Sequence, residues 1–169
     1  FTQVLLARNK AGYQNLAKLS SLGFMEGLYG IYPRIDKELV KQYREGLIAT
    51  TGGLGSEVPY LILHVGERQA EEAFVWWLRL FGEDFYAELN RHGIAEEDRV
   101  NDTLLKFCEK HGVKYFAANE TYYVDNEEAT AHDVLLCIKE GEFKSTPIGE
   151  GRCTRYGLSN TNYYFRSQQ

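Results

Sequence analysis

Two residues in the second half of the chain combine metal-binding side chains with positions where ligands are expected. His92 follows the segment DFYAELN (residues 84–90), and Glu120 follows VKYFAAN (residues 113–119); both segments have strand-like patterns. In parallel α/β folds, reactive groups gather where strands end at their carboxyl termini. An imidazole and a carboxylate at two such ends predict a metal site. The alternative is that each residue only caps or closes its loop.

The stretch YFAANETYYV (residues 115–124) contains the second of these positions. It begins with four apolar residues, which predict a buried strand. Asn119, Glu120, Thr121 and Tyr122 then follow, where a parallel strand passes into its loop. This pattern is typical of a metal site, of the remains of one, or simply of a strand end.

The other residues with reactive side chains give weaker signals. We expect His64 and His111 at the surface, and His132, beside Asp133, as a structural hydrogen-bonding group. The three cysteines are far apart, and Cys108 and Cys137 lie in apolar segments as small core residues do. No paired metal spacing and no Ser-His-Asp or Cys-His pattern is evident, and this cysteine usage fits a reducing cytoplasm.

Short apolar runs alternate with amphipathic segments along the chain. Strands are expected at 2–7, 46–52, 84–90 and 113–119, and helices at 12–26, 36–44, 56–66, 67–81, 95–111 and 125–138. This alternation predicts an α/β protein of parallel β/α units, either an open doubly wound sheet or part of a barrel. No glycine-rich dinucleotide fingerprint or phosphate loop is present.

Two of the expected helices carry apolar stripes that must be covered. In 67–81, one stripe comprises Ala70, Phe74, Trp77 and Phe81, and a second comprises Ala73, Trp76 and Leu80. Two stripes require two partners, so the second is either core or covered by parts outside this chain. In 125–138, the residues expected to face inward are Ala131, Val134, Leu135 and Ile138.

Composition is that of a soluble globular protein. The 169 residues suit one domain, 44% are hydrophobic, and the net charge of −5 argues against DNA binding by this chain alone. No apolar run reaches membrane-spanning length, and no signal peptide is evident. Residues 151–169 contain three arginines and four aromatic residues but no acids. This segment fits an arm leading to another domain, or a surface that stacks on single-stranded nucleic acid.

Several segments together resemble a known family. They are LLARNKAGYQNLAKLSSLGFMEGLYG, PRIDKELV, EGLIATTGGLGSEVP, FYAELNRHG, VNDTLLKFCEKHGVKYFAANE, AHDVLLCIKEG and RYGLSNTNYYFRSQ, in this order. They resemble the PHP domain of bacterial DNA polymerase III alpha subunits, whose fold is a distorted seven-stranded β/α (TIM-like) barrel. The resemblance implies that residues 1–150 are the C-terminal portion of the PHP domain, without its N-terminal units and their His-x-His motif. Residues 151–169 would then be a linker arm toward the polymerase core.

The resemblance also carries over metal-ligand positions. His92 keeps a family histidine, and Glu120 stands where the family has an aspartate. Gln3 and Tyr122 replace histidines, and Gly53 lies where the family has a cysteine. A phenol with a pKa near 10 and a neutral amide are poor substitutes for imidazole. The metal candidates that remain, His92 and Glu120, are therefore expected to be vestigial, with no catalytic residue in this chain.

The resemblance implies a part of the replicative polymerase, a nucleotidyltransferase of DNA replication in the cytoplasm. This portion is expected to be structural, inactive alone, and to dock the proofreading exonuclease; the alternative is an active metal-dependent 3′–5′ exonuclease or phosphoesterase. No cofactor is expected in this chain. If the metal site is active, Zn or Mn is expected there, and Mg is expected in the absent polymerase core. The expected partners are the rest of the alpha subunit and the exonuclease subunit, with DNA bound only through the parent protein and no membrane.

Overall fold

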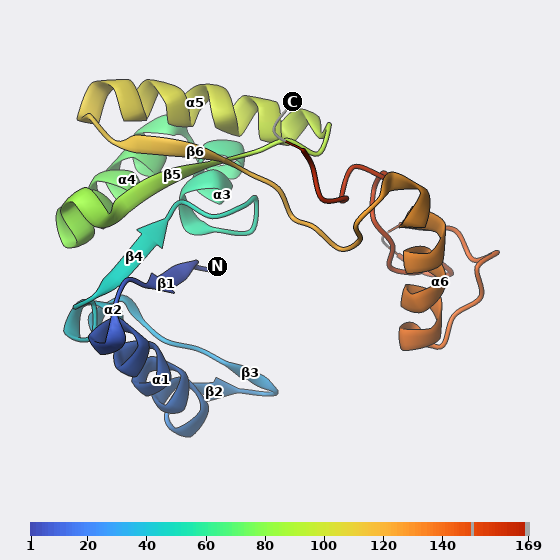
Figure 1. Cartoon of the computed structure of the whole chain (residues 1–169), viewed down its shortest axis with the longest axis horizontal. Helices are drawn as coiled ribbons and strands as arrows, with labels where there is room; N and C mark the ends of the chain where they lie inside the picture. Colours follow the sequence, from blue (N-terminus) through green and yellow to red (C-terminus); the bar gives the residue numbers. More distant parts are fainter. Residues whose placement is uncertain (150, 168–169) are drawn as a thin grey trace. The chain divides into compact units, whose positions relative to one another are not determined.

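The computed structural model describes residues 1–149 and 151–167 (Figure 1). The elements are β1 (Leu5–Ala7), α1 (Lys10–Met25), β2 (Leu28–Tyr29), β3 (Tyr32–Pro33), α2 (Lys37–Gln42), β4 (Leu47–Thr50), α3 (Glu57–His64), α4 (Glu67–Phe81), β5 (Phe85–Asn90), α5 (Ala95–His111), β6 (Lys114–Ala118) and α6 (Ala129–Glu140). Short 3-10 helices precede β5 and α6, at Gly82–Asp84 and Asn126–Glu128. Every expected helix and strand is present, and a small β2–β3 hairpin lies between α1 and α2.

The chain divides into two compact units. Unit 1 comprises Phe1–Leu89 and Arg99–Phe116; unit 2 comprises Asn90–Asp98 and the described residues that follow Phe116. Among the described residues, no helix is long and apolar enough to cross a lipid bilayer.

The larger sheet has the strand order β1-β4-β5-β6. β4 and β5 are parallel, with Ala49 opposite Phe85 and Thr50 opposite Tyr86. Parallel strands joined by helices confirm the predicted α/β class. Within the described residues the sheet does not close into a barrel, as expected for part of a PHP fold.

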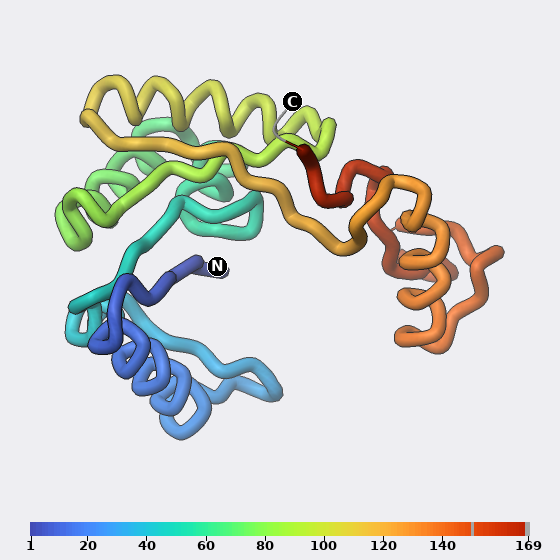
Figure 2. Tube along the Cα trace, viewed as in Figure 1, coloured from blue at the N-terminus to red at the C-terminus, as the bar shows by residue number. Residues whose placement is uncertain are grey.

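β1 departs from the predicted parallel arrangement because it runs antiparallel to β4, with Leu6 opposite Ile48. The reason lies in the connection between them, which leaves β1 along α1 and returns through the β2–β3 hairpin and α2 (Figure 2). This connection brings the chain back to the C-terminal end of β1, where the Arg8 amide donates to the Gly46 carbonyl at 2.8 Å. A connection that returns to the same end places the next strand in the opposite direction.

The core of unit 1 is centred on Phe74 of α4. Its ring lies 5.1 Å from that of Phe85 in β5 and 5.5 Å from that of Phe107 in α5, and all three side chains are buried. The first predicted stripe of α4 is buried along its whole length. In the second stripe Ala73 is buried, while Trp76 and Leu80 are half-buried against the same core. Both stripes therefore pack within this chain.

Two predicted helix starts are confirmed at the level of individual hydrogen bonds. The Asp36 carboxylate accepts from the Leu39 amide at 2.8 Å and begins α2. Asp125 and Glu128 form a capping box that begins the helical segment leading into α6. These acids satisfy amide groups that have no partner within the helix.

Two burial predictions are wrong. β6 is not buried: Tyr115 is 57% exposed and Phe116 is 41% exposed, because β6 lies at the edge of the sheet. α6 does not bury the predicted face, since Val134, Leu135 and Ile138 are all exposed and Ala131 is too. The buried residue of α6 is Cys137.

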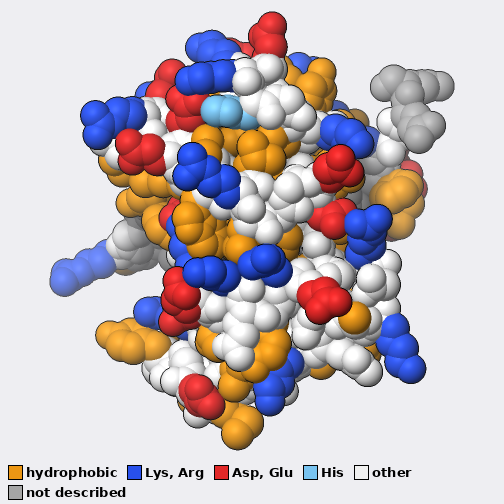
Figure 3. Space-filling view, turned by 90° about the vertical axis from the view of Figure 1, so that its left-hand side faces the viewer, with side chains coloured by type: hydrophobic (Ala, Val, Ile, Leu, Met, Phe, Trp, Pro, Cys, Tyr) orange, Lys and Arg blue, Asp and Glu red, His pale blue; other side chains and the backbone are white. Residues whose placement is uncertain are grey.

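The surface carries charges of both signs. On the face drawn in Figure 3, Lys and Arg side chains alternate with Asp and Glu, and hydrophobic side chains lie exposed between them. The described residues on this face therefore do not form the single-sign patch that attracts nucleic acid.

Candidate functional site

The structure brings the predicted residues His92 and Glu120 together within unit 2. The backbone amide of Glu120 donates to His92 Nε2 at 3.0 Å. His92 lies just beyond the end of β5, and Glu120 just beyond the end of β6. The expectation that strand ends gather these two residues therefore holds in space.

The imidazole of His92 is deeply buried and hydrogen-bonded at both nitrogens. The ring is 2% exposed, and Nδ1 lies 2.6 Å from Glu97 Oε1. The second oxygen of the same carboxylate accepts from the His92 backbone amide at 2.6 Å. Because Nε2 accepts a hydrogen bond from the Glu120 amide, Nδ1 is the nitrogen that carries the hydrogen and donates to Glu97.

The segment before the C-terminus completes the surroundings of His92. The ring of Tyr163 stacks on the imidazole with centroids 4.5 Å apart and planes 15° apart. The side-chain amides of Asn160 and Asn162 both donate to the His92 carbonyl oxygen, at 2.7 and 2.9 Å. His92 is thus held through its ring, its amide and its carbonyl.

Residues 119–124 and 163–165 are joined by further backbone hydrogen bonds. The Tyr122 amide donates to the Tyr163 carbonyl at 2.9 Å, and the Phe165 amide donates to the Tyr123 carbonyl at 3.0 Å. These bonds form a short parallel bridge between Tyr123 and Tyr164. The C-terminal segment therefore packs onto the loop that follows β6.

Tyr122, which is expected from the resemblance to replace a histidine, faces Glu120. Its hydroxyl lies 3.4 Å from Glu120 Oε2, and the side chain is half exposed. Desolvation, with a further contribution from the negative charge of Glu120, raises the pKa of the Tyr122 phenol above its usual value. A phenol that stays protonated is a weak metal ligand.

Gln3 and Gly53 belong to unit 1. The Gln3 side-chain amide donates to the Thr50 carbonyl at 2.7 Å and to the Val4 carbonyl at 3.0 Å. Its NH₂ group is therefore engaged with the backbone at β4. Gly53 offers no side-chain donor, and its neighbour Thr51 accepts from the Glu88 amide at 2.9 Å.

The residues present do not fit a cluster of metal ions in the arrangement observed. The lone pair of His92 Nε2, which a metal would need, is occupied by an amide hydrogen. Among the described residues, no group of three or more His, Cys, Asp or Glu side chains is placed to hold a metal ion. The carboxylate–histidine pair of Glu97 and His92 does keep the form that orients a metal-binding imidazole.

The other three histidines are His64, His111 and His132. His64 is exposed as predicted. His111 is only partly at the surface, because its Nε2 lies 2.6 Å from Glu71 Oε1. His132 contacts the rings of Tyr122 and Tyr123 at centroid distances of 5.3 and 5.5 Å.

The sequence interpretation missed the partners of His92. Glu97 lies in the first turn of the expected helix 95–111, and Asn160, Asn162 and Tyr163 lie in the segment 151–169, which was expected to be an arm or a stacking surface. The spacing of five residues between His92 and Glu97 was a usable signal, since it lets a helix-start carboxylate reach back to the loop before it. Nothing local indicated the asparagines, which are almost 70 residues away in the sequence.

Comparison with known proteins defines the class of this protein. The PHP domain family model matches residues 1–92, more than half of the chain, and the chain belongs to that family. Strand ends that gather His92 and Glu120 are consistent with this assignment.

The chain is also similar to particular members of that class. It is 42% identical to the DNA polymerase III subunit alpha of Borreliella burgdorferi over 98% of this chain, and 40% identical to that of Deinococcus radiodurans over 95%. It is 42% identical to that of Thermus aquaticus over 82%. The chain spans only 14, 12 and 11% of the length of these three relatives, respectively.

Proposed function

We propose that this chain is the PHP region of a replicative DNA polymerase III alpha subunit in which a former metal site has become a structural joint. The polymerase activity of the parent, a cytoplasmic nucleotidyltransferase that uses Mg²⁺, would reside outside these residues. The similarity to three alpha subunits supports the parentage. The region would support the polymerase core and dock the proofreading exonuclease.

One observation carries the structural part of the proposal. His92 Nε2 accepts the Glu120 amide at 3.0 Å, while Nδ1 is held by Glu97 at 2.6 Å. A histidine whose two nitrogens are both bound to protein groups fixes the loop after β5 to the loop after β6. The losses at Gln3, Gly53 and Tyr122 support the same conclusion, because they leave too few donors for metal-assisted phosphoester hydrolysis.

Metal analysis of the full-length protein tests this proposal. The protein is purified without chelators and its Zn, Mn and Fe contents are measured per polypeptide, with and without a His92→Ala substitution. We expect no stoichiometric metal that depends on His92. Two or three tightly bound ions that are lost in the variant would refute a vestigial site.

A second candidate, an active metal-dependent phosphoesterase, is favoured by the Glu97–His92 pair. That pair fixes the imidazole orientation as outer-shell carboxylates do in metal sites. Hydrolysis of a chromogenic phosphodiester is measured with and without Mn²⁺ by the full-length protein and by its His92→Ala variant. A rate that requires both Mn²⁺ and His92 would establish this function in place of the structural one.

Docking of the exonuclease is tested separately. The proposed parent polymerase subunit is compared with a variant of it that lacks the segment corresponding to residues 1–167 of this chain. Binding of each to the exonuclease subunit is followed by gel filtration. We expect the complex to be lost with the deletion. A complex of unchanged affinity would place docking elsewhere.

A further inference from the structure

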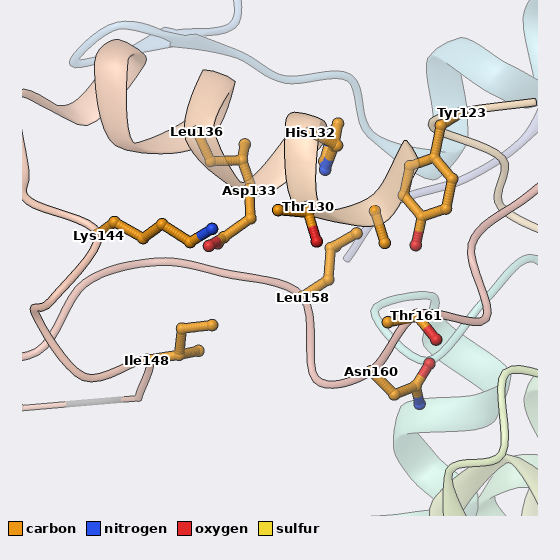
Figure 4. A pocket seen from close by; sticks show the side chains of 11 residues that line it. Tyr123, Thr130, His132, Asp133, Leu136, Lys144, Ile148, Leu158, Asn160 and Thr161 are labelled. Carbon is orange, nitrogen blue, oxygen red and sulfur yellow. The ribbon is translucent and has the colours of Figure 1, made fainter. Parts of the chain in front are cut away.

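Unit 2 contains a cavity of about 240 Å³ beside α6 (Figure 4). One wall is formed by residues 129–136 of α6, and the others come from Tyr123 and from residues 144–148 and 158–161. Its apolar lining includes Leu136, Ile148 and Leu158, and its polar lining includes Thr130, Lys144 and Thr161. Asn160, which donates to the His92 carbonyl, also lines this cavity, but His92 itself is not among the lining residues.

Tyr123 provides the observation that points to a ligand. Its side chain is only 8% exposed, and its hydroxyl has no hydrogen-bond partner among the described residues. Tyr123 lines the cavity, and Figure 4 shows its hydroxyl directed toward the side where Asn160 and Thr161 lie. A buried hydroxyl without a partner is unfavourable, so a group that hydrogen-bonds to it inside the cavity would be bound favourably.

The walls of the cavity are held in place by Arg155. Its guanidinium makes two hydrogen bonds to the Asp133 carboxylate, at 2.7 and 2.9 Å, and a third to the Thr146 carbonyl at 2.9 Å. The Arg155 side chain is 4% exposed. A backbone bridge between Arg155 and Ile148 continues this connection. The cavity is therefore bounded by a fixed framework rather than by surface side chains alone.

The charges around the cavity favour an anion. Both oxygens of Asp133 are bound by Arg155, so the carboxylate found among the described lining residues is neutralised. Lys144 then adds a positive charge. Figure 4 shows Lys144 beside Asp133 at one end of the cavity, Tyr123 toward the other end, and Leu158 between them.

We propose that this cavity binds a small organic anion with a hydrocarbon body. Its carboxylate or phosphate group pairs with Lys144, and its hydrocarbon chain packs on Leu136, Ile148 and Leu158. A hydrogen-bond acceptor at the far end, such as a carbonyl oxygen, accepts from the Tyr123 hydroxyl. The proposal concerns a ligand site and is independent of whether the His92 site ever holds metal.

The test uses four probes that vary one group at a time: 6-oxoheptanoate, heptanoate without the carbonyl, methyl 6-oxoheptanoate without the charge, and 5-oxohexyl phosphate. Binding to the full-length protein is followed by saturation-transfer NMR, which observes the small molecule and tolerates a large protein. We expect 6-oxoheptanoate or the phosphate to bind at least about fivefold more tightly than heptanoate and the ester. Whichever of the two binds more tightly identifies the anionic group.

Two substitutions test whether the probes bind in this cavity. Tyr123→Phe should weaken 6-oxoheptanoate about fivefold and leave heptanoate unchanged, because only the former offers an acceptor to the hydroxyl. Lys144→Gln should weaken the anions but not the ester. The controls are Tyr156→Phe and Lys139→Gln, which alter an exposed tyrosine and an exposed lysine outside the lining.

The proposal fails if no probe binds, or if all four bind equally to the wild type and both variants. It also fails if Tyr123→Phe raises thermal stability without changing any probe affinity. That result would mean that the hydroxyl is merely an unfavourable buried group.

Discussion

In the proposed structural joint, His92 keeps the position of a metal ligand and serves as a structural residue. The imidazole is oriented by a carboxylate, as in metal sites. Its other nitrogen, Nε2, accepts a hydrogen bond from a backbone amide. That amide belongs to Glu120, the residue that would supply the neighbouring ligand. This hydrogen bond therefore uses the Nε2 lone pair to which a metal ion would bind.

Replacing His92 by alanine should loosen the loop after β6. The substitution leaves the Glu97 carboxylate buried without its ring partner and frees the Glu120 amide, at a cost of about 3 kcal/mol. Hydrogen exchange of residues 117–124 in the intact protein should accelerate about 100-fold. His64→Ala, at an exposed position, is the control and should change nothing. Unchanged exchange in the His92 variant would show that the joint is not structural.

At the scale of elements, α1 depends on how closely it approaches the start of β4. A Cβ atom on Gly12 would lie 1.9 Å from the Gly46 carbonyl oxygen, and the backbone of that turn has little room to move. Nearby, the Asn15 side chain donates to the Glu45 carbonyl at 2.8 Å. Glycine at position 12 is therefore required by packing between a helix and a turn.

Gly12→Ala should destabilise unit 1 by about 3 kcal/mol, because the helix must move away from the turn. Urea unfolding of the 169-residue chain measures this through the fluorescence of Trp76 and Trp77, both in α4 of unit 1. Ser20→Ala, on the exposed side of α1, is the matched control and should stay within about 0.5 kcal/mol. Equal stabilities of the two variants would contradict the packing argument.

Glu71 links α4 to the end of α5 and makes this contact dependent on pH. Hydrogen bonds from Lys110 first, and then from His111, lower the pKa of the Glu71 carboxyl. A carboxyl with a lowered folded pKa stabilises the protein above its unfolded pKa of about 4.3, and this contribution is lost as pH falls through the folded value.

The Glu71→Gln variant should therefore lose about 1 kcal/mol or less at pH 7, since the side chain is 26% exposed. The difference from wild type should shrink progressively below pH 4.5, as measured by the same fluorescence. Glu72→Gln, which alters a highly exposed pair with Arg68, serves as the control. A difference that grows toward low pH would have the wrong sign and would reject this account.

The elements were more predictable than their surroundings. Helix α4 was predicted to the residue, because its apolar spacing and the glycines on either side are local signals. The antiparallel β1 and the exposed face of α6 were not predictable, because they depend on where a long connection returns and on what packs nearby. The metal candidates were located by strand ends, whereas Asn160 and Asn162 act on His92 only through the three-dimensional fold.

At the scale of the whole molecule, unit 1 exposes large apolar side chains at two places. The β2–β3 hairpin presents Leu28, Tyr29, Ile31 and Tyr32, each more than half exposed. The edge strand β6 presents Tyr115 and Phe116. A sheet edge with exposed aromatic residues can pair with another chain.

We therefore expect the isolated 169-residue chain to self-associate. Its sedimentation coefficient should rise with concentration between about 1 and 100 µM, a range in which weak interfaces form. Ile31→Lys and Tyr115→Lys should each weaken association about tenfold or more, because each places a charge in an apolar contact. Gln14→Lys adds the same charge at an exposed polar position of α1 and should have no effect.

If the chain sediments as a monomer at every concentration, its exposed hairpin and edge strand do not act as interfaces. If only one lysine variant weakens association, that variant identifies which of the two surfaces forms the contact.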